Sequence, residues 1–162
     1  MKAIYIIGLL AFITGCTSYD TQITKPLPTK LNKDYPVKIY LPENGRYDQI
    51  NYKNSGQMTA DALKTAFKYH ASNVTIVTNT MQPGTEAYFI KPELLHWEDR
   101  ATEWSGRRDH ITIQITIFDE KTKTLKTSTI IRGASSWFTF GGDHPQDLLQ
   151  KPINDYVNTL YN

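Results

Sequence analysis

The stretch Ile111-Thr112-Ile113-Gln114-Ile115-Thr116-Ile117 decides the fold, because isoleucine alternates with a polar residue at every step. Successive side chains of a strand point to opposite faces, so this period predicts a strand with one buried and one open face. Turns at 105–108 and 119–124 separate it from two further predicted strands, residues 87–104 and 125–133. We therefore expect an antiparallel meander of three strands.

Shorter elements flank the meander. Residues 37–41 alternate and residues 74–77 are β-branched, so both predict strands, and a helix is expected between them at 57–71. A C-terminal helix is expected to begin at Asp143 and to break at Pro152. The predicted fold is α+β with the order β-α-β-β-β-β-α and helices on one face of a mainly antiparallel sheet.

The beginning of the chain has the composition of an export signal. Lys2 precedes an apolar run, residues 3–12, that is too short to span a bilayer as a stable helix. The run Ile13-Thr14-Gly15-Cys16 resembles the lipobox of bacterial lipoproteins, which implies a signal peptide at 1–15, cleavage before Cys16 and acylation of its thiol. The membrane partner implied is the bilayer that holds this lipid.

A flexible tether is expected after the lipidated cysteine, over residues 16–34, because polar residues and prolines dominate there. Residues 35–162 are then expected to form a single periplasmic domain. Thr17, and not aspartate, follows Cys16. By resemblance to enterobacterial sorting, this favours the outer membrane, with the domain facing the periplasm.

Charge and cysteine content narrow the function. The chain has a formal net charge of +2 and one cysteine among 162 residues. Balanced charge argues against nucleic acid as a partner. With Cys16 lipidated, the mature chain has no thiol for disulfides, thiolate catalysis or metal binding, and no cofactor is expected.

The most polar run is His96-Trp97-Glu98-Asp99-Arg100-Ala101-Thr102-Glu103-Trp104-Ser105-Gly106. Burying Trp97 costs less than burying an unpaired carboxylate, so we expect Trp97 on the core side, opposite Ile115 across a three-residue loop. His96, Glu98 and Arg100 would then share the opposite face. A second polar run at residues 141–147 is expected to meet the first in the fold.

Four interpretations of these runs remain open. The first is a structural ion-pair network, and the second is a binding groove with exposed Trp104, Trp137 and Phe138. The third is a metal site, although the ligand spacing matches no metal motif. The fourth is a hydrolase, although Glu98 and Glu103 would project to opposite faces and no nucleophile motif is present. The candidate residues for the network or groove are His96, Trp97, Glu98, Asp99, Arg100, Glu103, Trp104, Trp137, Asp143 and His144; the metal reading adds His110.

The lipobox, the run from His96 to Gly106 and the run Phe140-Gly141-Gly142-Asp143-His144-Pro145-Gln146-Asp147-Leu148-Leu149 together resemble a family of Gram-negative envelope lipoproteins known as a domain of unknown function. The order of elements is similar to that of TolB amino-terminal, curli-secretion and transport-auxiliary lipoprotein domains. The expected function is a non-enzymatic, lipid-anchored protein that binds or helps assemble another envelope component. The alternative is a periplasmic hydrolase or metal-binding protein that uses His96, Glu98, Asp143 and His144.

Overall fold

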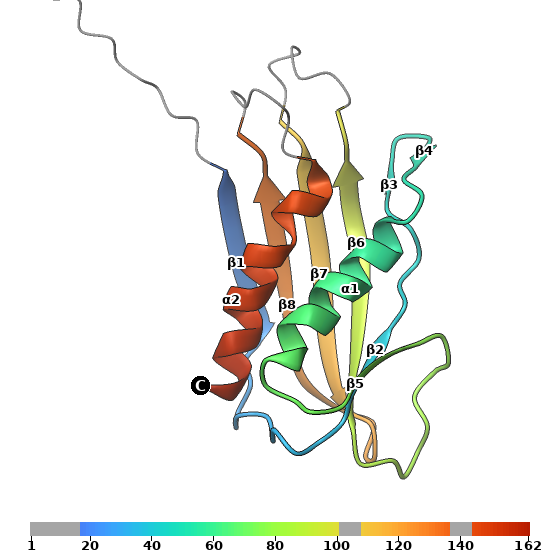
Figure 1. Ribbon diagram of the computed structural model, residues 1–162, viewed down its shortest axis with the longest axis vertical. Helices are drawn as coiled ribbons and strands as arrows, with labels where there is room; N and C mark the ends of the chain where they lie inside the picture. Colours follow the sequence, from blue (N-terminus) through green and yellow to red (C-terminus); the bar gives the residue numbers. More distant parts are fainter. Residues whose placement is uncertain (1–16, 101–107, 137–143) are drawn as a thin grey trace, which may run out of the picture.

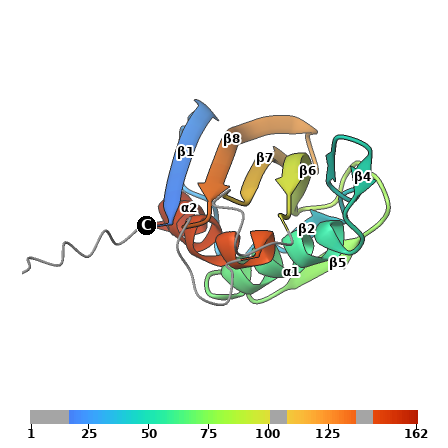
Figure 2. The same ribbon diagram turned by 90° about the horizontal axis from the view of Figure 1, so that it is seen from above.

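A six-stranded sheet with two helices on one face forms the frame of the molecule (Figures 1 and 2). The computed structural model describes residues 17–100, 108–136 and 144–162. The elements are β1 Ser18–Lys25, β2 Val37–Tyr40, β3 Arg46–Tyr47, β4 Ile50–Asn51, α1 Ser55–Lys68, β5 Val74–Val77, β6 Tyr88–Glu98, β7 His110–Asp119, β8 Thr124–Ala134, the 3-10 helix η1 Pro145–Leu148 and α2 Gln150–Tyr161. The strand order in the sheet is β1-β8-β7-β6-β2-β5.

The predicted meander is present, and it holds the core. Strands β6, β7 and β8 pair antiparallel, and the four alternating isoleucines of β7 are each at most 1% exposed. Each such side chain contributes roughly 1.5–3 kcal/mol on burial. The α+β class is therefore confirmed. The sheet is mixed, because β2 pairs parallel with both β5 and β6.

The two helices pack against the isoleucine side of the sheet and against each other. In α1 the apolar stripe runs along one side at helical spacing, with Leu63 and Phe67 fully buried. In α2 the buried face is formed by Ile153, Tyr156, Val157 and Leu160. The opposite face of the sheet has no helix over it among the described residues (Figure 2).

The expected tether at 16–34 is wrong for residues 18–25 and for Leu31. Residues 18–25 form strand β1, which pairs antiparallel with β8 from Ser18 opposite Ala134 to Lys25 opposite Ser128. The side chains of β1 are mostly exposed, so its sequence has no apolar period, but its backbone pairs with the N–H and C=O groups on the edge of β8. Leu31 is also packed, 4% exposed, and its N–H donates to the carbonyl of Leu160 at 2.9 Å.

The hairpin between β6 and β7 also differs from the prediction. Strand β6 ends at Glu98, well before Trp104, and β7 begins at His110; residues 101–107 lie outside the described part of the chain. The register shifts between Leu94 and His96, so Leu95 forms a β-bulge. Trp97 lies opposite Ile111, and not Ile115, because residues 99–109 join the two strands in place of the expected three-residue loop; the bulge alone shifts the pairing by one residue.

The exact order of elements is longer than predicted, because β1 and the small β3–β4 hairpin add to it. At the C-terminus the helix is interrupted at Leu149, between η1 and α2. The break was expected at Pro152, but this proline lies in the first turn of α2, where a missing N–H leaves no helical bond unmade. The expected cap Asp143 lies outside the described residues, and His144 is the residue that precedes η1.

Among the described residues, no helix combines the length and apolar character needed to cross a membrane.

Candidate binding site on the open face of the sheet

The uncovered face of β1, β8, β7 and β6 bears a hollow of about 480 Å³ at one end of the sheet. Two cross-strand rows cross it. One row is Asp20, Arg132, Thr112 and His96, and the next is Ser18, Ala134, His110 and Glu98. The lining therefore carries both signs of charge together with hydroxyl and imidazole groups.

The bulge at Leu95 decides which side chains reach this hollow. One extra residue in β6 reverses the alternation, so Leu94 and Trp97 both face the core, and His96 and Glu98 face outward. Trp97 is 2% exposed, which confirms that it is buried. It fits there because Gly45 has no side chain: an added Cβ would lie 2.5 Å from the Cβ of Trp97.

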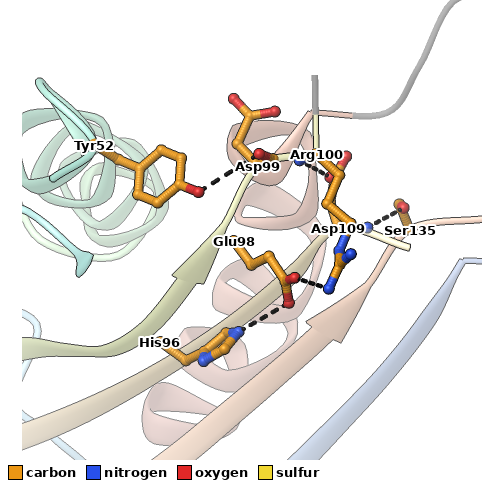
Figure 3. Close-up of polar contacts among 7 residues, drawn as sticks. All are labelled: Tyr52, His96, Glu98, Asp99, Arg100, Asp109 and Ser135. Atoms are coloured by element: carbon orange, nitrogen blue, oxygen red, sulfur yellow. Dashed lines mark hydrogen bonds and ion pairs between the residues drawn. The ribbon is translucent and has the colours of Figure 1, made fainter. Parts of the chain in front are cut away.

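Glu98 lies at the floor of the hollow and is 4% exposed. Figure 3 shows its carboxylate between the side chains of His96 and Arg100. One carboxylate oxygen lies 3.2 Å from Nε2 of His96, and the other forms an ion pair with the guanidinium of Arg100. The ring of His96 packs edge-on against Tyr47 of β3, with centroids 4.8 Å apart. A buried carboxylate is costly unless it is paired, so Arg100 compensates the charge that the bulge places here.

Asp109 connects the strand ends beside the hollow through hydrogen bonds (Figure 3). Its Oδ1 accepts a hydrogen bond from the backbone N–H of Arg100 at 2.6 Å, and its own N–H donates to Oγ of Ser135 at 2.9 Å. The N–H of Ser135 donates back to the carbonyl of Asp109 at 3.0 Å. Burial raises the pKa of the Asp109 carboxyl, with the hydrogen bond from Arg100 opposing the shift. This residue joins the ends of β6, β7 and β8.

The polar run that begins at His96 and the one at residues 141–147 come into contact among the described residues, as expected. Nδ1 of His144 lies 3.6 Å from a carboxylate oxygen of Asp99, and the hydroxyl of Tyr52 donates to the carbonyl of Asp99 at 3.5 Å. The backbone N–H of His144 donates to Asp147, which orients the start of η1. Asp99 thus links β6, the segment before α1 and the C-terminal helices.

Several predicted site residues cannot be placed. Glu103, Trp104, Trp137 and Asp143 lie outside the described residues. In the parts of the chain that the structure describes, no three histidine, cysteine, aspartate or glutamate side chains come together as a metal site would need. Among the predicted residues, His96, Glu98 and Arg100 form one cluster, Asp99 and His144 a second beside it, and His110 lines the hollow.

Residues 29–160 match the family described as "Domain of unknown function (DUF4823)". The chain belongs to this family. The family likeness expected from the runs His96 to Gly106 and Phe140 to Leu149 stays a prediction. No curated protein matches the chain.

The DUF4823 chain has a fold similar to several solved structures. The PelC dodecamer from Paraburkholderia phytofirmans superposes with a TM-score of 0.60 at 10% identity, over 85% of this chain and 96% of that one. Protein XCC0632 from Xanthomonas campestris, of family DUF330, gives a TM-score of 0.55 at 13% identity, over 84% and 89%. At these identities the likeness shows the fold alone, and the similarity to TolB domains stays a prediction.

The DUF4823 site includes residues that were not predicted: Ser18, Asp20, Thr112, Arg132 and Ala134 in the hollow, and Asp109 and Ser135 beside it. Strand alternation could have placed Arg132 on the open face, since it lies between Ile131 and Gly133 in the predicted strand. Asp20 could not have been found, because its strand has no sequence signal. Asp109 and Ser135 act through backbone hydrogen bonds at strand ends, which side-chain periodicity does not report.

Proposed function

We propose that this DUF4823 protein is a non-enzymatic, lipid-anchored protein of the outer membrane that binds or helps assemble another envelope component through the hollow on its open sheet face. The observation that carries the binding proposal is the hollow itself. It lies on the side of the sheet away from both helices, and its buried Glu98 is paired and held in place by side chains of the same chain. A concave site in which a few polar groups are held in fixed positions is typical of ligand recognition.

The anchor rests on the sequence. Residues 1–15 resemble a lipoprotein signal peptide, the lipobox cysteine Cys16 follows it, and Thr17 favours release to the outer membrane. Changing Cys16 to Ala should leave the protein unlipidated. Mass spectrometry of the mature N-terminus checks this directly, and an unmodified Cys16 in the wild-type protein would refute the anchor.

The non-enzymatic reading rests on how the polar groups are used. Glu98 is held between His96 and Arg100, and Asp109 accepts a backbone hydrogen bond, so within the described residues both carboxylates are engaged by groups of the same chain. The alternative, a periplasmic hydrolase or metal-binding protein, would use the same His96–Glu98 pair, whose ring nitrogen and carboxylate oxygen lie 3.2 Å apart.

The binding surface is tested by filling the hollow. Thr112 lies half-buried at its centre, between Arg132 and His96, and Thr65 is an exposed threonine on α1 that serves as a matched control. In pull-downs from solubilised envelopes, Thr112→Lys should lose the proteins that the wild type captures, and Thr65→Lys should keep them. The same captured proteins with both variants would refute this surface. Arg100 is unsuitable for such a test, because its loss would leave Glu98 buried without its cation.

A further inference from the structure

The anchor and the hollow lie at the same end of the sheet. Strand β1 starts at Ser18, two residues after Cys16, and Ser18 pairs with Ala134. Ala134 pairs with His110, which pairs with Glu98. The first residue of β1 is therefore in the row of side chains that lines the hollow, at the end of the sheet where β6 and β8 finish and β7 begins (Figure 1).

Strand β1 is held firmly enough to fix this position. Besides its ladder with β8, the hydroxyl of Thr129 donates to the carbonyl of Gln22 at 3.0 Å and that of Thr127 to the carbonyl of Lys25 at 2.7 Å. A guanidinium nitrogen of Arg132 lies 3.0 Å from the carboxylate of Asp20. The chain between anchor and sheet is thus shortened from the expected eighteen residues or so to Thr17 alone.

Two residues of extended chain span at most about 7 Å. An acylated Cys16 has its acyl chains in the bilayer core and its backbone at the headgroups. The end of the sheet that starts at Ser18 must then lie within about that reach of the headgroups. The opposite end of the sheet, at the β7–β8 turn, lies about the length of β7 from Ser18, roughly 30 Å for a strand of its ten residues.

The charges at this end of the sheet would not draw it toward anionic lipid headgroups. Among the described residues 98–100 and 108–110, Arg100 and Arg108 stand against Glu98, Asp99 and Asp109, so there is no positive excess to attract anionic lipids. Within the described residues, the short connection at Thr17 is therefore the feature that places this end of the sheet beside the bilayer.

We propose that the end of the sheet formed by Ser18, Ala134, His110 and Glu98 faces the phospholipid headgroups of the leaflet that holds the anchor, so that the hollow opens at the membrane surface. This inference rests on the proposed lipidation of Cys16. It also specifies the partner: a component that is embedded in the same membrane, or lies flat on it, reaches the hollow, whereas one confined to the middle of the periplasm does not.

Energy transfer in the full lipidated protein tests the orientation. The mature chain has no other cysteine once Cys16 is acylated, so a single dye can be placed at His110→Cys or at Thr122→Cys, both exposed positions. Each labelled protein is reconstituted into phosphatidylethanolamine–phosphatidylglycerol vesicles that carry an acceptor dye on the headgroups. Transfer from position 110 should be several-fold greater than from position 122. Equal transfer, or greater transfer from position 122, would overturn the inference.

A linker insertion tests the cause. Twenty glycine and serine residues placed between Thr17 and Ser18 keep the lipobox and the sorting residue intact, and they should bring the two transfer efficiencies close together. An unchanged ratio after insertion would show that the short connection does not set the orientation, which overturns the inference as stated. Mass spectrometry of the same samples separates the two proposals: an unacylated Cys16 overturns the anchor and this inference with it, whereas an acylated Cys16 with equal transfer overturns this inference alone.

Discussion

Glu98 and Arg100, two residues apart at the end of β6, form an ion pair in which the carboxylate is buried and the guanidinium is partly exposed (Figure 3). The pair exists because the bulge at Leu95 turns Glu98 to the open face, and because Asp109 holds the backbone of Arg100 in place. The floor of the hollow and the ends of three strands therefore depend on the same few contacts.

Arg100→Ala should lower the free energy of unfolding by about 2–3 kcal/mol, because it leaves the Glu98 carboxylate buried without its cation. Urea denaturation measures the change. Arg132→Ala removes an exposed ion pair with Asp20 and should cost less than about 1 kcal/mol, which makes it the matched control. Adding Glu98→Gln to Arg100→Ala should recover part of the loss. Equal losses for Arg100→Ala and Arg132→Ala would contradict this view of the pair.

The contribution of Asp109 to the free energy of unfolding should fall as the pH rises. Its pKa is raised in the folded state by burial, whereas an unfolded aspartate titrates near about 3.9. Between these two pKa values the folded state binds more protons than the unfolded state, so this group's contribution to the free energy of unfolding falls with rising pH.

Asp109→Asn removes that titration, and its amide oxygen can still accept the hydrogen bond from the backbone of Arg100. The free energy of unfolding of the Asn variant, relative to the wild type, should therefore increase as the pH rises above about 3.9. Denaturant titrations at a series of pH values check the sign. A relative stability that is constant or falls with pH would contradict the assigned cause.

Replacing residues 18–25 by glycine and serine at equal length should lower the unfolding midpoint, because β8 loses its partner strand. Amide exchange along β8 should accelerate, whereas exchange in β2 and β5, at the far side of the sheet, serves as an internal reference. If residues 18–25 were a tether, neither the midpoint nor exchange in β8 would change.

The periodicity of apolar residues predicts the core strands correctly but does not predict the strand at the edge of the sheet. The isoleucines of β7 predicted their own burial and the strands on both sides, since each alternate side chain sits in a buried face. Strand β1 carries no such signal, because as an exposed edge strand it buries almost no side chain and is held by its backbone. The predicted helix break at Pro152 is wrong, because the sequence alone does not show that this proline lies in the first turn of α2.

For the site, too, some features could be predicted from the sequence and others could not. The expected separation of Trp97 from His96, Glu98 and Arg100 is correct, because the cost of burying an unpaired charge decides it. The register is wrong, because residues 99–109 join β6 and β7 where a three-residue loop was expected, and because the bulge at Leu95 adds a further shift of one residue. Asp109 was overlooked, since its role depends on two strand ends that approach each other only in the folded protein.

The central claim is that the hollow on the open face is a binding surface, and photo-crosslinking in intact cells tests it most directly. A photoreactive amino acid is placed at Thr112 in the hollow or at Thr65 on α1, in the otherwise native, membrane-bound protein. We predict a discrete crosslinked product with an envelope component from position 112 and none of that product from position 65. Absence of any crosslink from position 112, or the same product from both positions, would contradict the proposed binding surface.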